Sequence, residues 1–512
     1  MAIDDKLLEE ILLSQNIPTD GETFVDIVYG GAFSIRDYYM ESGNPRQMRG
    51  ASQLLIEAAE LGKYSNSKYF TCGAESFFIV PHGKGAKTAA RFERDFQDKT
   101  LTARAAVVSQ ETELRALQNK EEFRKLWIKI NELFHERRML IFPSLEISEG
   151  KERCVRCNFR EPTGGEISVA GTKMLLCPSC YAKHKKGGEA RSKYIDECLE
   201  FAEEHKLGLG AITAFKAGYA QTTNDLSAKP DDSDGIGDIA LLYADINNLG
   251  GIGEEFSGNL SERKVFTQAV KEAVTYALYC AVLKGSDRSI NKKFEIIAAG
   301  GDDICVLLPG DVALLVGTQL LEEFDKQLTE RSDMLKQYEM KISAGIAVGK
   351  ANTPLVYMRE AAEQLLKIAK EEAHRTGESC LDIISLNSDS QWATQINKKL
   401  RADLKIEEGT VKAIRTMRPF TVGAARRMLN WISQLENISS STLYRIAEAS
   451  MKLGIEEGNL WFNYLLSKQP SSERSLANLA KAISSDCKMY TKTDGDWRSP
   501  WRDLAELRGQ RI

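Results

Sequence analysis

The chain has 512 residues, of which 28% are charged, and a formal net charge of −5. This length exceeds what one hydrophobic core can serve and predicts roughly three or four domains. The near-balanced charge excludes a whole-protein basic field for nucleic acid, so any RNA contact must be local or made through partner subunits.

The sequence indicates neither a membrane protein nor a secreted one. No apolar stretch approaches the length of a membrane span, and the acidic residues 1–5 do not form a secretion signal. Ten cysteines in such a chain favour reduced thiols, some of them on metal, over a disulfide scaffold. We therefore expect a cytoplasmic protein without membrane contact.

We expect a short helix and a connector over residues 1–20, and a first α+β unit over residues 21–115. A strand at 23–29 precedes a helix that includes Gly50 to Ile56. Two apolar runs, 68–72 and 77–81, are joined by the small-residue turn Gly73-Ala74-Glu75-Ser76. The turn offers one carboxylate, so we expect no catalysis there. A purely structural pseudo-repeat is the competing interpretation of this unit.

Residues 116–220 are predicted to contain a helix over 121–142 and a metal module. Two Cys-x-x-Cys pairs, Cys154 with Cys157 and Cys177 with Cys180, match the spacing of a structural four-thiolate Zn²⁺ site. Thiolates favour zinc over magnesium. The nearby His184 could replace one ligand, although a solvated histidine is the better interpretation. We interpret the basic run 185–193 as a solvated loop, with nucleic-acid contact as the alternative.

Residues 221–238 are rich in Thr, Asn, Ser, Asp and Gly and are predicted to link to a second unit over residues 239–390. Its strands and helices follow a βαββαβ order, which is typical of a ferredoxin-like sheet. The first strand ends at Asp245, and the turn Gly300-Gly301-Asp302-Asp303 follows the second strand. Right-handed crossovers make these strands parallel, so Asp245 and the turn should lie at one edge of the sheet.

Three carboxylates at strand ends suit hard divalent cations that hold a nucleotide triphosphate. Gly300 and Gly301 allow positive φ angles and leave room for a ligand. The alternative is an ordinary solvated turn, in which Asp and Gly are common. The convergence of Asp245 with Asp302 and Asp303 favours the metal–nucleotide site.

Residues 391–512 have a helical, locally basic pattern with several apolar faces. One face contains Met428, Leu429, Ile432 and Leu435. We expect a C-terminal helical bundle here.

The Gly-Gly-Asp-Asp turn and the segment Asp245-Ile246-Asn247-Asn248-Leu249-Gly250 resemble the palm of nucleotidyl cyclases. The resemblance is closest to the large signature subunit of CRISPR type III effector complexes. It implies an α+β fold with two ferredoxin-like palm domains, the first degenerate, a zinc-ribbon insertion and a C-terminal α-helical bundle. Asn247 replaces an aspartate of the family's motif, which leaves the role of that position open.

The same resemblance implies the site residues. Asp245, Asp302 and Asp303 would be catalytic and, with the carbonyl of Ile246, would hold two Mg²⁺ or Mn²⁺ ions. Lys370, on the helix after the fourth strand, would meet the phosphates. Further nucleotide-binding residues would be Asn248, Leu249, Gly250, Gly300, Gly301 and, in the first palm, Ser52.

The implied activity is a metal-dependent nucleotidyltransferase that makes cyclic oligoadenylates from ATP. It would act with guide RNA, target RNA and other CRISPR effector subunits. The family often begins with a nuclease domain marked by a His-Asp pair, which this sequence lacks, so we expect no DNA cleavage of that kind. A stand-alone signalling cyclase and a non-catalytic nucleotide- or RNA-binding scaffold are the alternatives.

Overall fold

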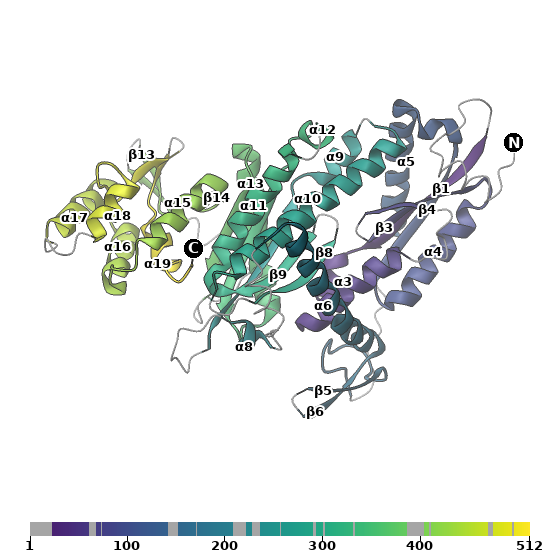
Figure 1. Cartoon of the computed structure of the whole chain (residues 1–512), viewed down its shortest axis with the longest axis horizontal. Coiled ribbons are helices and arrows are strands. Elements are labelled where there is room, and N and C mark those ends of the chain that lie inside the picture. Colours follow the sequence, from purple (N-terminus) through teal and green to yellow (C-terminus); the bar gives the residue numbers. More distant parts are fainter. Residues whose placement is uncertain are drawn as a thin grey trace.

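The computed structural model describes most of the chain. The described residues are 23–60, 68–72, 74–141, 152–169, 171–207, 222–227, 236–256, 258–289, 293–300, 303–330, 333–386, 404–408, 411–468, 475–493 and 496–511. The expected helix and connector at 1–20, half of the expected linker at 221–238, and Gly301 and Asp302 lie outside them. Two α+β units lie side by side, and a mainly helical unit lies at one end of the molecule (Figure 1).

The first unit is a four-stranded sheet of order β2-β3-β1-β4 with antiparallel neighbours. With two crossover helices this is the ferredoxin-like βαββαβ arrangement. Its elements are β1 (Phe24–Phe33), α2 (Ile35–Tyr39), α3 (Pro45–Ala59), β2 (Lys68–Cys72), β3 (Glu75–Pro81), α4 (Gly85–Thr100) and β4 (Arg104–Glu113). A short 3-10 turn, η2 (Leu114–Leu117), leads to α5 (Lys120–Met139), which packs its apolar side on the other face of this sheet.

The second unit repeats this plan in a larger sheet of order β14-β11-β10-β7-β9-β8. β7 pairs antiparallel with both β9 and β10, and β9 pairs antiparallel with β8, so β7 and β8 run parallel as expected from the sequence. The elements are α8 (Thr223–Leu226), β7 (Asp238–Ile246), α9 (Leu249–Glu255), α10 (Leu260–Ser286), β8 (Glu295–Gly300), β9 (Asp303–Pro309), η3 (Gly310–Val312), α11 (Ala313–Glu330), α12 (Asp333–Lys336), β10 (Ile342–Lys350), α13 (Leu355–Thr376) and β11 (Cys380–Ser385).

The two units share a hydrophobic core. One cluster of buried side chains contains Val28 and Phe78 from the first sheet together with Leu241, Tyr243 and Leu307 from the second. Because burial of each large apolar side chain contributes about 1.5–3 kcal/mol, this shared core fixes how the sheets face each other.

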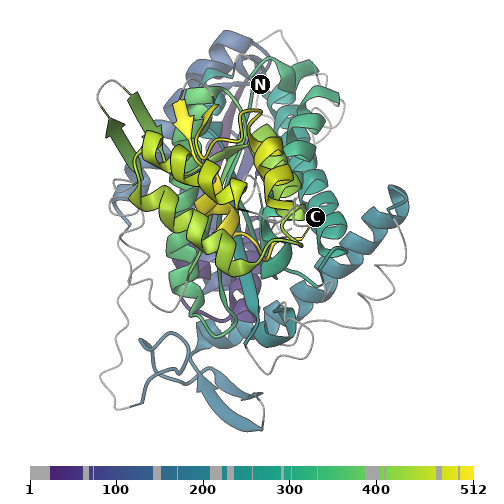
Figure 2. The same ribbon diagram turned by 90° about the vertical axis from the view of Figure 1, so that its left-hand side faces the viewer.

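The cysteine module projects from the body of the molecule in both views (Figures 1 and 2). It contains the hairpin of β5 (Gly165–Val169) and β6 (Thr172–Leu176), followed by the 27-residue helix α6 (Pro178–Glu204). The interpretation of residues 185–193 as a loop is wrong, because these residues form the middle of α6.

The C-terminal part contains the expected helices and also a small sheet that the sequence pattern did not indicate. The helices are α15 (Val422–Ser433), α16 (Ser440–Lys452), α17 (Ile455–Ser467), α18 (Ser475–Ile483) and α19 (Trp501–Glu506). The sheet has the order β12-β13-β16-β15, formed by β12 (Lys405–Glu408), β13 (Val411–Ile414), β15 (Thr491–Thr493) and β16 (Asp496–Arg498). The two-residue β14 (Phe420–Thr421) joins the edge of the second sheet. Among the described helices, none has the length and apolar composition needed to cross a membrane.

Candidate functional site

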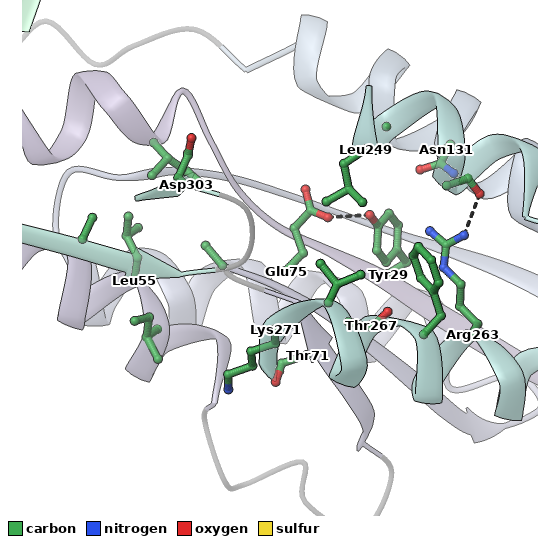
Figure 3. Close-up of a pocket in the computed structure, with 18 of the residues that line it drawn as sticks. Tyr29, Leu55, Thr71, Glu75, Asn131, Leu249, Arg263, Thr267, Lys271 and Asp303 are labelled. Carbon is green, nitrogen blue, oxygen red and sulfur yellow. Dashed lines mark hydrogen bonds between the residues drawn. The ribbon is translucent and has the colours of Figure 1, made fainter. Parts of the chain in front are cut away.

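A cavity of about 370 Å³ is lined by residues of both α+β units. Its volume falls within the roughly 300–1,000 Å³ of small-molecule sites. Of the residues predicted from the sequence, Ser52, Leu249, Gly250 and Asp303 line it. In Figure 3, Asp303 lies at one end of the cavity, and Tyr29 and Glu75 point toward one another near its centre.

Asp245 and Asp303 come together at the edge of the second sheet. Asp245 is the penultimate residue of β7, and Asp303 begins β9, where it pairs with Gly300 across the turn. The same nitrogen, Nη2 of Arg36, lies 3.8 Å from Oδ2 of Asp245 and 3.5 Å from Oδ1 of Asp303. Lys370 on α13 also contacts this pair, with its Nζ 2.5 Å from Oδ2 of Asp245.

Burial and the neighbouring charge of Asp245 raise the pKa of Asp303, despite its contacts with Arg36 and Tyr243. The hydroxyl of Tyr243 donates a hydrogen bond of 2.9 Å to Oδ1 of Asp303. Two neighbouring carboxylates, of which Asp303 has a raised pKa, are typical of a functional site.

The oxygen donors here fit a hard divalent ion, which prefers carboxylate and carbonyl oxygens. Asp245 and Asp303 supply two carboxylates, and β7 ends with the carbonyl of Ile246. The next residue along the chain, Asn247, is buried, and no described residue donates a hydrogen bond to its side-chain oxygen Oδ1. The position of Asp302, the remaining predicted ligand, lies outside the described residues.

The segment after β7 bends because Asn248 adopts the left-handed conformation, with φ 55°, at the start of α9. Asn tolerates this region better than most residues. A Cβ at Gly251 would lie 2.4 Å from Oδ1 of Asn248, so a larger residue there would displace the Asn248 side chain. The turn brings Leu249 and Gly250 to the wall of the cavity.

The first unit contains a partial copy of this arrangement, which we identify from strand register. Tyr29 pairs with Phe77, and Phe77 lies two residues after Glu75. In the same way, Tyr243 pairs with Cys305, and Cys305 lies two residues after Asp303. The hydroxyl of Tyr29 donates to Oε2 of Glu75 at 2.5 Å. Burial raises the pKa of Glu75.

The first unit has no counterpart of Asp245, since Gly31 takes its place two residues after Tyr29. A Cβ at Gly31 would lie 1.9 Å from the carbonyl oxygen of Ala74, so no larger side chain fits. This close contact explains in physical terms why the first unit offers one carboxylate rather than a chelating set.

The four cysteines predicted to bind zinc form one buried cluster. Their sulfur atoms all lie within 4.8 Å of one another, and Sγ of Cys157 lies 3.8 Å from Sγ of Cys177. Four zinc–sulfur bonds of about 2.3 Å in a tetrahedron require sulfur separations of about 3.8 Å. The cluster therefore fits a structural Zn²⁺ ion. His184 is not a member of it.

Arg36, Tyr39 and Tyr243 belong to the site but were missed from the sequence. The hydroxyl of Tyr39 lies 3.3 Å from that of Tyr243, and the guanidinium of Arg36 lies 5.1 Å from the centre of the Tyr243 ring. The spacing along the chain gave a signal for Arg36. Since Gly31 corresponds to Asp245, Arg36 corresponds to Gly250, which also lies five residues later. Ser34 and Asn248 also share left-handed φ angles before α2 and α9.

Comparison with known proteins agrees with this architecture. Residues 238–377 match the family model of the Cas10/Cmr2 second palm domain. Among solved structures, the Csm1–Csm4 cassette in complex with cA4 shares 12% identity with a TM-score of 0.54, covering 96% of this chain and 70% of that one. The cassette in complex with one ATP shares 12% identity with a TM-score of 0.53, and Csm1 of T. onnurineus shares 11% identity with a TM-score of 0.51. Each of these two matches covers 96% of this chain and 70% of the other. A comparison with curated proteins gives no match.

The TM-scores and the coverage of these structures establish a shared fold. Together with the family match, they confirm the resemblance and the fold class predicted from the sequence.

Proposed function

We propose that this chain, with its Cas10/Cmr2-like second palm and Csm1-like fold, is a metal-dependent nucleotidyltransferase. It would join ATP molecules by attack of a 3′-hydroxyl on an α-phosphate and close the product into cyclic oligoadenylates. The observation that supports this most is the meeting of Asp245, Asp303 and Lys370 beside a cavity shared by two palms.

In this proposal Asp245, Asp302, Asp303 and the Ile246 carbonyl hold two Mg²⁺ or Mn²⁺ ions. When bound, such ions stabilise charge on the transferred phosphoryl group and the leaving pyrophosphate. Lys370 exchanges its contact with Asp245 for the β- and γ-phosphates of the donor nucleotide. The remaining nucleotide contacts come from Asn248, Leu249, Gly250, Gly300, Gly301 and, on the first palm, Ser52.

The first palm binds the second nucleotide without catalysing transfer. Ser52 and Glu75 line the cavity, while the contact of Gly31 with Ala74 leaves no space for another metal ligand.

The four cysteines hold Zn²⁺ as a structural ion. Domain boundaries near residues 20, 115, 220, 238 and 390 belong to the same proposal.

The similar structures support part of the proposed set of partners. Two of the similar structures are Csm1–Csm4 cassettes, one in complex with cA4 and one with ATP. We propose a corresponding assembly for this chain, in which other effector subunits and guide RNA are present and target RNA triggers synthesis.

The test is an incubation of the purified chain with each labelled nucleoside triphosphate and Mn²⁺, repeated with partner subunits, guide RNA and target RNA. We expect oligoadenylate only in the complete mixture, and none with the Asp302→Ala/Asp303→Ala variant. Product without partners would indicate a stand-alone cyclase. Persistent synthesis by the double variant would refute the assignment, and no product from the parent in any mixture would indicate a scaffold.

A further inference from the structure

Arg36, a side chain of the first palm, contacts both described carboxylates at the edge of the second. It lies on α2, directly after the left-handed residue Ser34. Its Nη2 is 3.5 Å from Asp303 and 3.8 Å from Asp245, and its guanidinium lies over the ring of Tyr243. All three contacts cross from one palm to the other.

The position of this cation is informative because it is the place where divalent ions would bind. Asp245 and Asp303 carry two negative charges, and Arg36 and Lys370 supply two positive ones. Divalent ions at these oxygens would compete with the guanidinium for the same lone pairs. Arg36 would then lose its partners just as a triphosphate arrives.

The backbone of α2 is fixed, whereas the Arg36 side chain is 45% exposed. The hydroxyl of Tyr38 donates to the carbonyl of Thr100 at 2.8 Å. Beyond α2, Glu41 accepts hydrogen bonds from the buried Lys183 at 2.5 Å and from Arg160, both in the cysteine module. A half-exposed arginine on a fixed backbone can exchange partners without any change of fold.

The chemistry of the side chain also fits a phosphate partner. A guanidinium offers several N–H donors in a plane that matches two phosphate oxygens, and it stacks on aromatic rings. The Tyr243 ring beneath Arg36 thus keeps the guanidinium at the edge of the sheet while its anionic partner changes.

We propose that Arg36 is a phosphate-binding residue that the first palm contributes to the nucleotide held by the second. It neutralises Asp245 and Asp303 while divalent ions are absent, and it contacts the triphosphate once those ions occupy the carboxylates. The proposal rests on the nucleotide site of the proposed function and adds a cross-palm contact to it.

The test uses the full chain with Arg36→Ala, Arg36→Lys and the control Arg91→Ala, an arginine on α4 that pairs with Asp95 in the same helix. Mn²⁺ titration without nucleotide should show about threefold or tighter binding to Arg36→Ala, because a competing cation is gone. With Mn²⁺ present, the affinity for ATP should fall about tenfold or more, and that for adenosine should stay unchanged. The Mn²⁺ and ATP affinities of Arg36→Lys should lie between those of Arg36→Ala and the parent, and those of Arg91→Ala should equal the parent's.

The opposite directions of the two effects exclude a merely structural role, which would weaken both. Unchanged ATP affinity in Arg36→Ala would overturn the proposal, and so would an equal loss of affinity for ATP and adenosine. Both readouts are equilibrium binding. If the parent binds ATP but makes no product, the proposed transferase activity is contradicted. The binding measurements then still decide the role of Arg36.

Discussion

The pairing of a tyrosine with a carboxylate occurs twice, once in each palm. Tyr243 donates to Asp303 at 2.9 Å, and Tyr29 donates to Glu75 at 2.5 Å. Burial raises the pKa of Tyr243, which keeps its hydroxyl protonated as a donor. We infer that this hydrogen bond orients the Asp303 carboxylate toward the cavity.

Replacement of Tyr243 by Phe removes the hydroxyl and leaves the ring beneath Arg36 in place. The loss of one orienting hydrogen bond, about 0.5–1.5 kcal/mol, should lower turnover about 2- to 10-fold with the fold intact. Steady-state synthesis measures this, and Tyr444→Phe, at an exposed position on α16, is the control. Equal turnover in Tyr243→Phe and the parent would show that the hydroxyl does not orient Asp303.

The sequence alone predicted that Asp245 and Asp303 meet, because strand order and crossover handedness decide which strand ends share an edge. It could not predict Arg36, because the contact depends on how two sheets pack across a shared core. The presence of Gly31 in the first palm, where the second palm has Asp245, is likewise explained only by the close approach of the Ala74 carbonyl oxygen.

At the scale of elements, α6 connects the cysteine module to both palms. It begins directly after Cys177, whose Sγ accepts a hydrogen bond from the backbone N–H of Cys180. Its later residues Tyr194 and Cys198 pack in the core of the second palm. Gly187 and Gly188 suggested a loop from the sequence. The structure shows instead that Gly50 and Gly187 allow α3 and α6 to cross closely. A Cβ at Gly50 would lie 1.8 Å from the carbonyl oxygen of Lys183, and a Cβ at Gly187 would lie 1.7 Å from that of Arg46.

This crossing predicts different effects for two adjacent glycines. Gly187→Ala should destabilise the chain by about 1–3 kcal/mol, because the new methyl group meets backbone. Gly188→Ala should be neutral or stabilising, because its methyl group would meet only the flexible end of Arg46, 2.8 Å away, and alanine favours a helix. Thermal unfolding of both variants decides this, and a larger loss for Gly188→Ala would contradict the described crossing.

The cysteine cluster predicts one zinc ion per chain. Its removal by a chelator should expose α6 to proteolysis and lower the melting temperature, since structural zinc stabilises the folded state directly. Cys177→Ser should have the same effect, whereas Cys487→Ser, outside the cluster, should retain the zinc. Metal analysis of the purified variants measures this. Full zinc content in Cys177→Ser would contradict a four-thiolate site.

For the whole molecule, one buried ionic cluster fastens the C-terminal part to the second palm. Arg418 contacts Asp503 at 2.8 Å and Glu506 at 2.7 Å, and its Nη1 donates to the carbonyl of Ile383 in β11. Asp503 is fully buried and also accepts from Thr416 and from the backbone N–H of Met417. The sequence predicted the helices of this part but not this cluster, whose members are up to 88 residues apart.

Replacement of Arg418 by Ala would leave buried carboxylates without their cation. Such a loss typically costs about 3–5 kcal/mol, so we expect a lower unfolding midpoint in urea and early separation of the C-terminal part. Arg427→Ala, an exposed arginine on α15, is the matched control and should leave the midpoint unchanged. An unaltered midpoint for Arg418→Ala would show that the cluster does not hold the two parts together.

The most direct measurement is anomalous diffraction from crystals grown with Mn²⁺ and a non-hydrolysable ATP analogue. We predict two manganese peaks at about 2.2 Å from carboxylate oxygens of Asp245 and Asp303, with Asp302 in the same shell and the triphosphate alongside. A triphosphate bound elsewhere, or an absence of manganese at these aspartates in crystals that contain the nucleotide, would contradict the proposed site.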